Sequence, residues 1–88
     1  MALALFTLIL DFEGGTYIAQ REAIGPEEAV LSWARALNEE GVEWAQAVAS
    51  IDADGLVPLD GLKNAWCSSG VCDGANPLLN IVQTATGV

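Results

Sequence analysis

The sequence predicts an α+β domain with two layers, in which an antiparallel sheet of about four strands carries one or two helices on one face. Three observations support this class. Apolar and polar residues alternate over residues 4–12, as they do in a half-buried strand. A proline and a glycine bound a helical pattern over residues 26–40. Two strand-like segments follow later, which gives the order ββααββ along the chain.

The first two strands are predicted to form a β-hairpin. Residues 4–12 place their larger apolar side chains on one face, namely Phe6, Leu8, Leu10 and Phe12. Gly14-Gly15 supplies the positive φ values that a two-residue turn requires, and residues 16–23 return as the second strand. This turn sets two cross-strand pairs on the apolar face, Phe12 with Tyr17 and Leu10 with Ala19.

The first helix is predicted over residues 26–40. Pro26 suits the first helical position, and the acidic Glu27 and Glu28 face the positive end of the helix dipole. Gly41 is a typical C-terminal stop. Four apolar residues recur at helical spacing and are expected to form the buried stripe, namely Val30, Trp33, Ala34 and Leu37.

The second half of the chain is less regular. Residues 42–51 are expected to form a short helix because of their alanine and glutamine content, although alternating Val42, Trp44 and Gln46 would also allow a strand. Asp52 to Gly55 reads as a turn, and Pro58 argues against a central strand over 56–59. The last two strands are predicted at about 63–68 and 78–84, separated by a stretch rich in glycine and serine.

Residues 50–61 are similar to part of a calcium-binding loop, with Asp52, Asp54 and Gly55 at the matching positions. Ser50 and Gly61 stand at the two ends of the loop, where calcium coordination needs carboxylates. We therefore expect an ordinary Asx turn in this segment and no metal site.

The chain is small, apolar and acidic. Its 88 residues make one domain, 1–88, and a hydrophobic content of 52% exceeds what so small a core hides. Only three basic residues face twelve acidic ones, so the chain cannot build the basic patch that nucleic acid or an anionic membrane attracts. We predict a homo-oligomer, most simply a homodimer, or a complex with another protein, and no nucleic-acid or membrane partner.

The apolar start of the chain, residues 1–10, is expected to be a buried strand of a cytoplasmic protein. It has no positively charged segment before the apolar run and no small-residue cleavage site after it, as a signal peptide requires. It is also much shorter than the ~20 residues of a membrane-spanning helix.

The composition removes the usual parts of most enzymes. The chain has no histidine, which excludes Ser-His-Asp and Cys-His catalysis and histidine metal sites. It also has neither a P-loop nor a GxGxxG motif. These absences favour a role that is not enzymatic and that uses no cofactor.

The remaining candidate for chemistry is the segment around two cysteines, Cys67 and Cys72. In a hairpin with a four-residue loop, they would lie opposite each other and form a redox-active disulfide. Two reduced cysteines, one of them packed beside Trp66, are the simpler expectation in a cytoplasmic protein. A third possibility is a metal shared by two chains, each contributing a cysteine pair. The candidate binding or redox loop comprises Asn64, Trp66, Cys67, Ser68, Ser69 and Cys72.

Two functional hypotheses follow from these observations. The favoured one is a small acidic module for protein–protein interaction or regulation, which self-associates through an exposed sheet edge or an apolar helix face. The alternative is a small redox or ligand-binding protein that uses the loop from Cys67 to Cys72.

Overall fold

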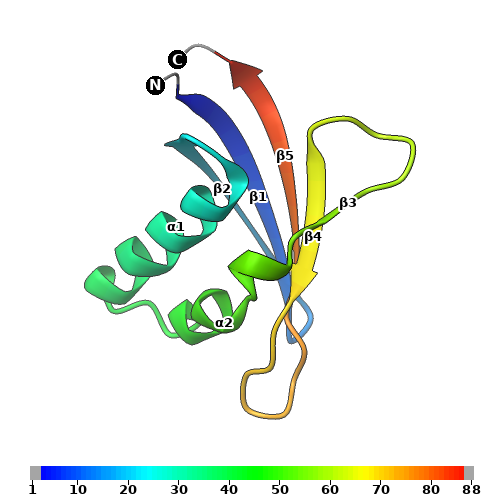
Figure 1. Ribbon diagram of the computed structural model, residues 1–88. Helices are drawn as coiled ribbons and strands as arrows, with labels where there is room; N and C mark the ends of the chain where they lie inside the picture. The colour runs from blue at the N-terminus through cyan, green and yellow to red at the C-terminus, as the bar shows by residue number, and fades with distance from the viewer. Residues whose placement is uncertain (1–2, 87–88) are drawn as a thin grey trace.

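Antiparallel strands form one sheet in the computed structural model, which describes residues 3–86 (Figure 1). The strands are β1 (Ala4–Phe12), β2 (Gly15–Ala23), β3 (Val57–Pro58), β4 (Ala65–Ser69) and β5 (Leu78–Thr86). Their order in space is β2-β1-β5-β4-β3, so the first and last strands of the chain pair directly. Between β2 and β3 the chain forms α1 (Pro26–Glu40), α2 (Ala45–Ser50) and a 3₁₀ helix (Ala53–Gly55). Figure 1 shows the helices on one side of the sheet.

The α+β class and the antiparallel sheet are confirmed, but the sheet has five strands in the described residues rather than about four. The predicted order ββααββ lacks β3, which has only two residues and lies at the sheet edge. Pro58 belongs to this strand and is tolerated there, because an edge strand leaves one row of backbone groups unpaired.

The hairpin of β1 and β2 is confirmed, but its predicted register is wrong by two residues. Phe12 pairs with Gly15, and Leu10 pairs with Tyr17. The turn consists of Glu13 and Gly14, with φ values of 48° and 81°, the pattern of a type I′ turn. Because the shift is an even number of residues, every side chain keeps its predicted face.

The residue that follows the turn, Gly15, lies close to an aromatic ring. It is the first residue of β2, and the ring of Tyr17 lies alongside it. A methyl group on Gly15 would stand 2.9 Å from Tyr17 Oη, so the absence of a side chain gives the tyrosine ring its place.

The first helix matches its prediction in both bounds. Pro26 begins it, and Gly41 ends it in the left-handed conformation at φ 72°. The Gly41 N–H donates to the Asn38 carbonyl at 3.2 Å, and the Val42 N–H donates to the Leu37 carbonyl at 3.1 Å. These bonds satisfy carbonyl groups that the helix end would otherwise leave without partners.

The later elements differ from their predicted bounds. The second helix has six residues, Ala45–Ser50, instead of the expected 42–51, and Trp44 stands before its first turn. Strand β4 begins at Ala65 rather than at 63, because Asn64 has a φ of 60°, which a strand does not accept. Strand β5 does not end at 84 as predicted. It continues to Thr86, which pairs with Ala4.

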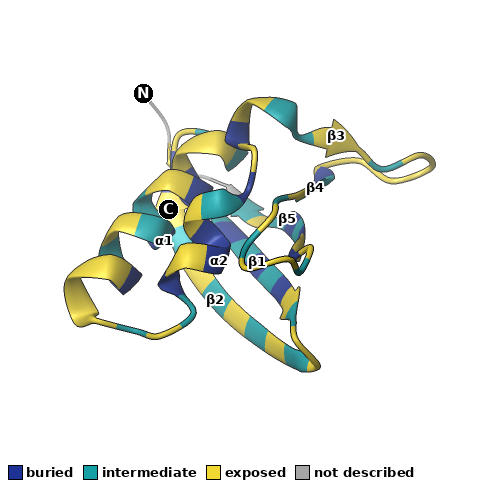
Figure 2. Cartoon of the chain, turned by 90° about the horizontal axis from the view of Figure 1, so that it is seen from below, coloured by how far each residue is buried: buried dark blue, intermediate teal, exposed yellow. Residues whose placement is uncertain are grey.

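The core lies between the helices and the sheet, as the buried residues in Figure 2 show. Its largest fully buried side chains come mainly from the inner face of β1 and β5, namely Phe6, Leu8, Leu10, Leu79 and Ile81. Trp33 and Val30 of α1 and Val48 of α2 close the core from the other layer. None of the described helices is both long and apolar enough to cross a membrane.

Candidate functional site

The predicted loop residues do not converge on one place. Along β4, successive side chains point to opposite faces of the sheet. Trp66 points toward the helices and packs on Phe6, with ring centroids 6.2 Å apart. Cys67 points to the other face, in register with Asn80 of β5 and Val57 of β3. Asn64 lies before the strand, and its carbonyl accepts a hydrogen bond from the Gln83 N–H at 2.8 Å.

Ser68 and Ser69 join the end of β4 to the segment that follows α2. The Ser68 hydroxyl donates to the Asp52 carbonyl at 2.8 Å, and the Asp52 N–H donates to the Ser69 carbonyl at 3.3 Å. Gly70 passes so close to Ser50 that a methyl group on it would overlap the Ser50 carbonyl. These contacts give both serines a structural role at the junction.

The cysteine geometry does not match the alternative of a hairpin with a four-residue loop. Ser69 pairs with Leu78, so residues 70–77 connect β4 to β5, and Cys67 lies opposite Asn80 rather than Cys72. Cys72 instead pairs with Ala75 across a second tight turn. Both thiols are free. Cys72 packs against the core, whereas Cys67 belongs to the opposite face of the sheet.

The second tight turn, at Asp73 and Gly74, has nearly the same backbone conformation as the turn between β1 and β2. Asp73 and Gly74 have φ values of 51° and 80°, close to those of Glu13 and Gly14. In each turn an acidic residue and a glycine take the two positions with positive φ. Since Asp11 pairs with Leu78, the two turns lie at the same end of the sheet, the lower end in Figure 1.

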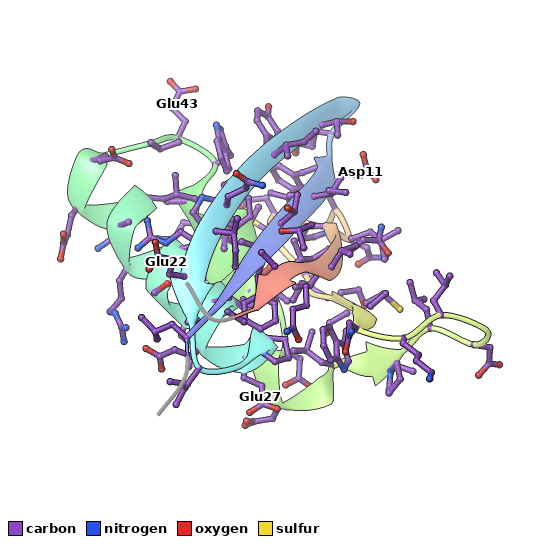
Figure 3. The ribbon with its side chains drawn as sticks, turned by 90° about the horizontal axis from the view of Figure 1, so that it is seen from above. Asp11, Glu22, Glu27 and Glu43 are labelled. Carbon is purple, nitrogen blue, oxygen red and sulfur yellow. The ribbon has the colours of Figure 1, made fainter. Side chains whose placement is uncertain are left out.

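A cavity of about 280 Å³ lies between these turns and the connection from α1 to α2. Its lining is aromatic on one side and acidic at the rim, and consists of Phe12, Glu13, Tyr17, Glu43, Trp44, Gln46, Cys72 and Asp73. We call it the acidic cavity. Figure 3 shows the labelled Glu43 projecting outward, so its carboxylate extends away from the protein body.

The aromatic side of the acidic cavity is held rigidly by stacking. The rings of Tyr17 and Trp44 are nearly parallel, with centroids 4.1 Å apart and an interplanar angle of 21°. Trp44 also meets Trp33 edge-on, with centroids 5.7 Å apart. Because Trp33 is buried in the core, this chain of rings anchors the cavity wall to the fold.

The charge at the cavity acts on the thiol of Cys72. Partial burial raises the pKa of this thiol, and the negative charges of Asp73 and Glu13 raise it further. Both tight turns therefore present their carboxylates close enough to sense the same sulfur atom. A raised pKa keeps the thiol protonated and weakly nucleophilic at neutral pH.

A second hollow of about 340 Å³ adjoins the acidic cavity along α2. The two share Gln46, Cys72 and Asp73, and the second extends past Ala49 to Val71. Together they form a groove between α2 and the turn at Asp73, which we call the α2 groove. The sequence contained a clue to it, because an Asp-Gly pair favours a type I′ turn.

In the part of the chain that the structure describes, the opposite side of the sheet carries no helix, and we call it the open face. An uncharged row crosses it from edge to edge, with one residue from each strand in register, namely Ile18, Ile9, Asn80, Cys67 and Val57. Ile18 is 67% exposed and Val57 is 57% exposed. A second row holds Gln20 and Thr7, which are joined by a hydrogen bond of 3.1 Å.

The carboxylates of the open face stand near the ends of its strands. Asp11 lies beside the hairpin turn, where it accepts a hydrogen bond from the Thr16 hydroxyl at 2.8 Å. Glu22 lies near the far end of β2, and Figure 3 shows the two residues well apart. The middle of the face is therefore free of charge in the described residues.

No metal centre emerges from the described residues, among which no three acidic or cysteine side chains form a metal-binding group. The Asx turn expected in residues 50–61 lies at Asp52, whose carboxylate accepts a hydrogen bond from the Asp54 N–H at 3.2 Å. The chain matches no protein-family model, and neither a curated protein nor a solved structure is significantly similar to it.

Proposed function

We propose that this protein is an interaction module that self-associates by packing its open face against that of a second copy. The observation that carries the proposal is the uncharged row across the five strands, from Ile18 to Val57. Sheets normally cover such a face with another layer, because exposed apolar side chains gain free energy when they leave water. Within residues 3–86, the helices lie on the other face.

A second copy suits this face for two reasons. When two copies stack about a two-fold axis, an uncharged row meets an uncharged row, while Asp11 and Glu22 stay near the rim. The four longer strands form a surface on the order of 600 Å² in plan, from the usual strand spacing and rise. This reaches the lower end of the area that each partner buries in a stable interface, about 600–1,000 Å².

The alternative of a redox loop has less support. A disulfide would need Cys67 and Cys72 opposite each other, and their strand register and faces separate them. The raised pKa of Cys72 also works against a reactive thiolate.

The test is the mass of the protein in solution, measured by sedimentation equilibrium and native mass spectrometry. We expect twice the mass of one chain at about 100 μM, in the affinity range of ordinary self-association. Ile18→Glu should raise the dissociation constant at least about 100-fold, since a two-fold interface loses both isoleucines and gains two charges.

The matched control is Leu31→Glu, the same type of change at a residue of α1 that is 49% exposed on the helical layer. It should leave the dimer intact. A monomeric wild-type protein would contradict the proposal, as would a dimer that survives Ile18→Glu. If only Leu31→Glu dissociated the dimer, the interface would lie on the helical layer instead of the open face. Added salt should strengthen the dimer, because each chain carries a formal charge of -9 and salt screens the repulsion.

A further inference from the structure

The acidic cavity combines a rigid aromatic wall with carboxylates from two separate turns. Its wall is fixed by the stack of Tyr17 on Trp44. Glu13 and Asp73, one from each tight turn, line it together with Cys72. A hollow with apolar walls and a few polar groups that converge on it is the usual form of a binding site.

Among residues 3–86, no basic side chain is paired with the carboxylates that line the cavity. None of the three basic residues is part of the lining. Arg35 forms an ion pair with Glu28 at 3.9 Å on α1, and Arg21 donates to the Ser32 hydroxyl at 3.3 Å. Lys63 lies in the loop before β4. A positively charged group that enters the cavity would therefore meet carboxylates that are free to bind it.

We propose that the acidic cavity binds the guanidinium side chain of an arginine in a partner polypeptide. The apolar stem of arginine fits against the aromatic wall while its charged head reaches the rim. Guanidinium carries five N–H donors along two edges, which suits carboxylates on two different turns better than the compact ammonium of lysine does. A volume of about 280 Å³ suits a single side chain.

The α2 groove supports a polypeptide as the source of this side chain. Its second hollow continues from the acidic cavity past Ala49 to Val71, and Val71 is 71% exposed. Backbone and neighbouring side chains of the partner can occupy this continuation while the arginine occupies the cavity. The site lies on the helical side of the sheet, so it is independent of the open face.

The experiment is a titration of the ¹⁵N-labelled full chain with the capped peptide Ala-Ala-Arg-Ala-Ala, followed by NMR and calorimetry. The matched probe replaces arginine with citrulline, which has nearly the same shape and no charge. We expect the arginine peptide to bind with a dissociation constant of about 1 mM or lower, as a single charged anchor supports. The largest shifts should occur at Cys72, Asp73 and the indole N–H of Trp44. The dissociation constant of the citrulline peptide should be about tenfold higher or more.

Two variants with equal loss of charge separate a site from general attraction. Glu13→Gln combined with Asp73→Asn should weaken binding about tenfold or more. Glu22→Gln combined with Glu27→Gln removes the same charge away from the cavity and should change it less than about twofold. Figure 3 shows Glu22 and Glu27 distant from Glu43 at the cavity rim.

Three results would overturn the proposal. One is no binding of the arginine peptide up to about 5 mM. Another is equal binding of the citrulline peptide. The third is an equal loss of affinity in both double variants, which would mean attraction by net charge alone. Added salt should weaken the binding of the peptide, whereas it should strengthen the proposed self-association. The failure of one proposal can therefore be distinguished from the failure of the other.

Discussion

Replacing Gly70 with alanine should destabilise the fold through a steric clash with backbone atoms. A Cβ on Gly70 would overlap the carbonyl oxygen and carbonyl carbon of Ser50, at the end of α2. A flexible side-chain end could move aside, but a carbonyl moves only with its chain segment. The φ of Gly70 is not in the left-handed region, so the added methyl group is the whole cause.

The magnitude follows from what the displaced segment loses. Overpacking of this kind costs about 1–3 kcal/mol. Moving Ser50 also strains the two hydrogen bonds that tie Asp52 to Ser68 and Ser69, each worth about 1 kcal/mol. In the opposite direction, alanine lowers the conformational entropy of the unfolded chain, which raises the free energy of unfolding by about 0.4–1 kcal/mol. We expect a net loss of about 2–3 kcal/mol, which is a large part of the stability of a folded chain of 88 residues.

The assay is urea unfolding at pH 7, followed by circular dichroism and tryptophan fluorescence. The midpoint should fall with little change in the m-value, and Tm should drop by about 10–20 °C. The control is Gly25→Ala, where the new methyl group has no neighbour within 4 Å. Gly25 is the N-cap of α1, so this variant should lose no more than about 1 kcal/mol. A Gly70→Ala protein as stable as Gly25→Ala would refute the reasoning. Complete rescue by adding Ser50→Ala would also refute it, because that change leaves the carbonyl in place.

Three other substitutions test the cavity and its turns. Gly15→Ala should displace the Tyr17 ring from its stack, changing near-UV circular dichroism and costing about 1 kcal/mol or less. Glu13→Asn should raise the unfolding free energy by up to about 1 kcal/mol, because asparagine tolerates the φ of 48° better than glutamate does; unchanged or lower stability in urea would count against it. Asp73→Asn should speed alkylation of Cys72 at pH 8, because removing a negative charge lowers the thiol pKa and leaves more thiolate. In the wild-type protein the same raised pKa should lower the unfolding free energy as pH rises above the ordinary thiol range, since the unfolded chain then loses its proton first.

Local sequence patterns determined the first half of the fold. Alternation over residues 4–12 defined the inner face of β1, and Pro26 and Gly41 bounded α1 at the predicted residues. These features depend on neighbours within a few positions, so they can be recognised without the rest of the molecule. The hairpin was also predictable, although its turn was not, because Glu13-Gly14 and Gly14-Gly15 both offer a glycine for positive φ.

Tertiary structure alone decided the sites. Glu13 and Asp73 are far apart in the chain, and they meet at Cys72 because β5 returns to pair with β1. Cys67 and Cys72 are close in the chain, and they separate because β4 continues its pairing to Ser69 and turns only later. Such contacts depend on which strands become neighbours, a choice made by the packing of the whole core. The sequence therefore determined the hairpin of β1 and β2, the long helix and the acidic charge, while the fold determined which charges share a cavity.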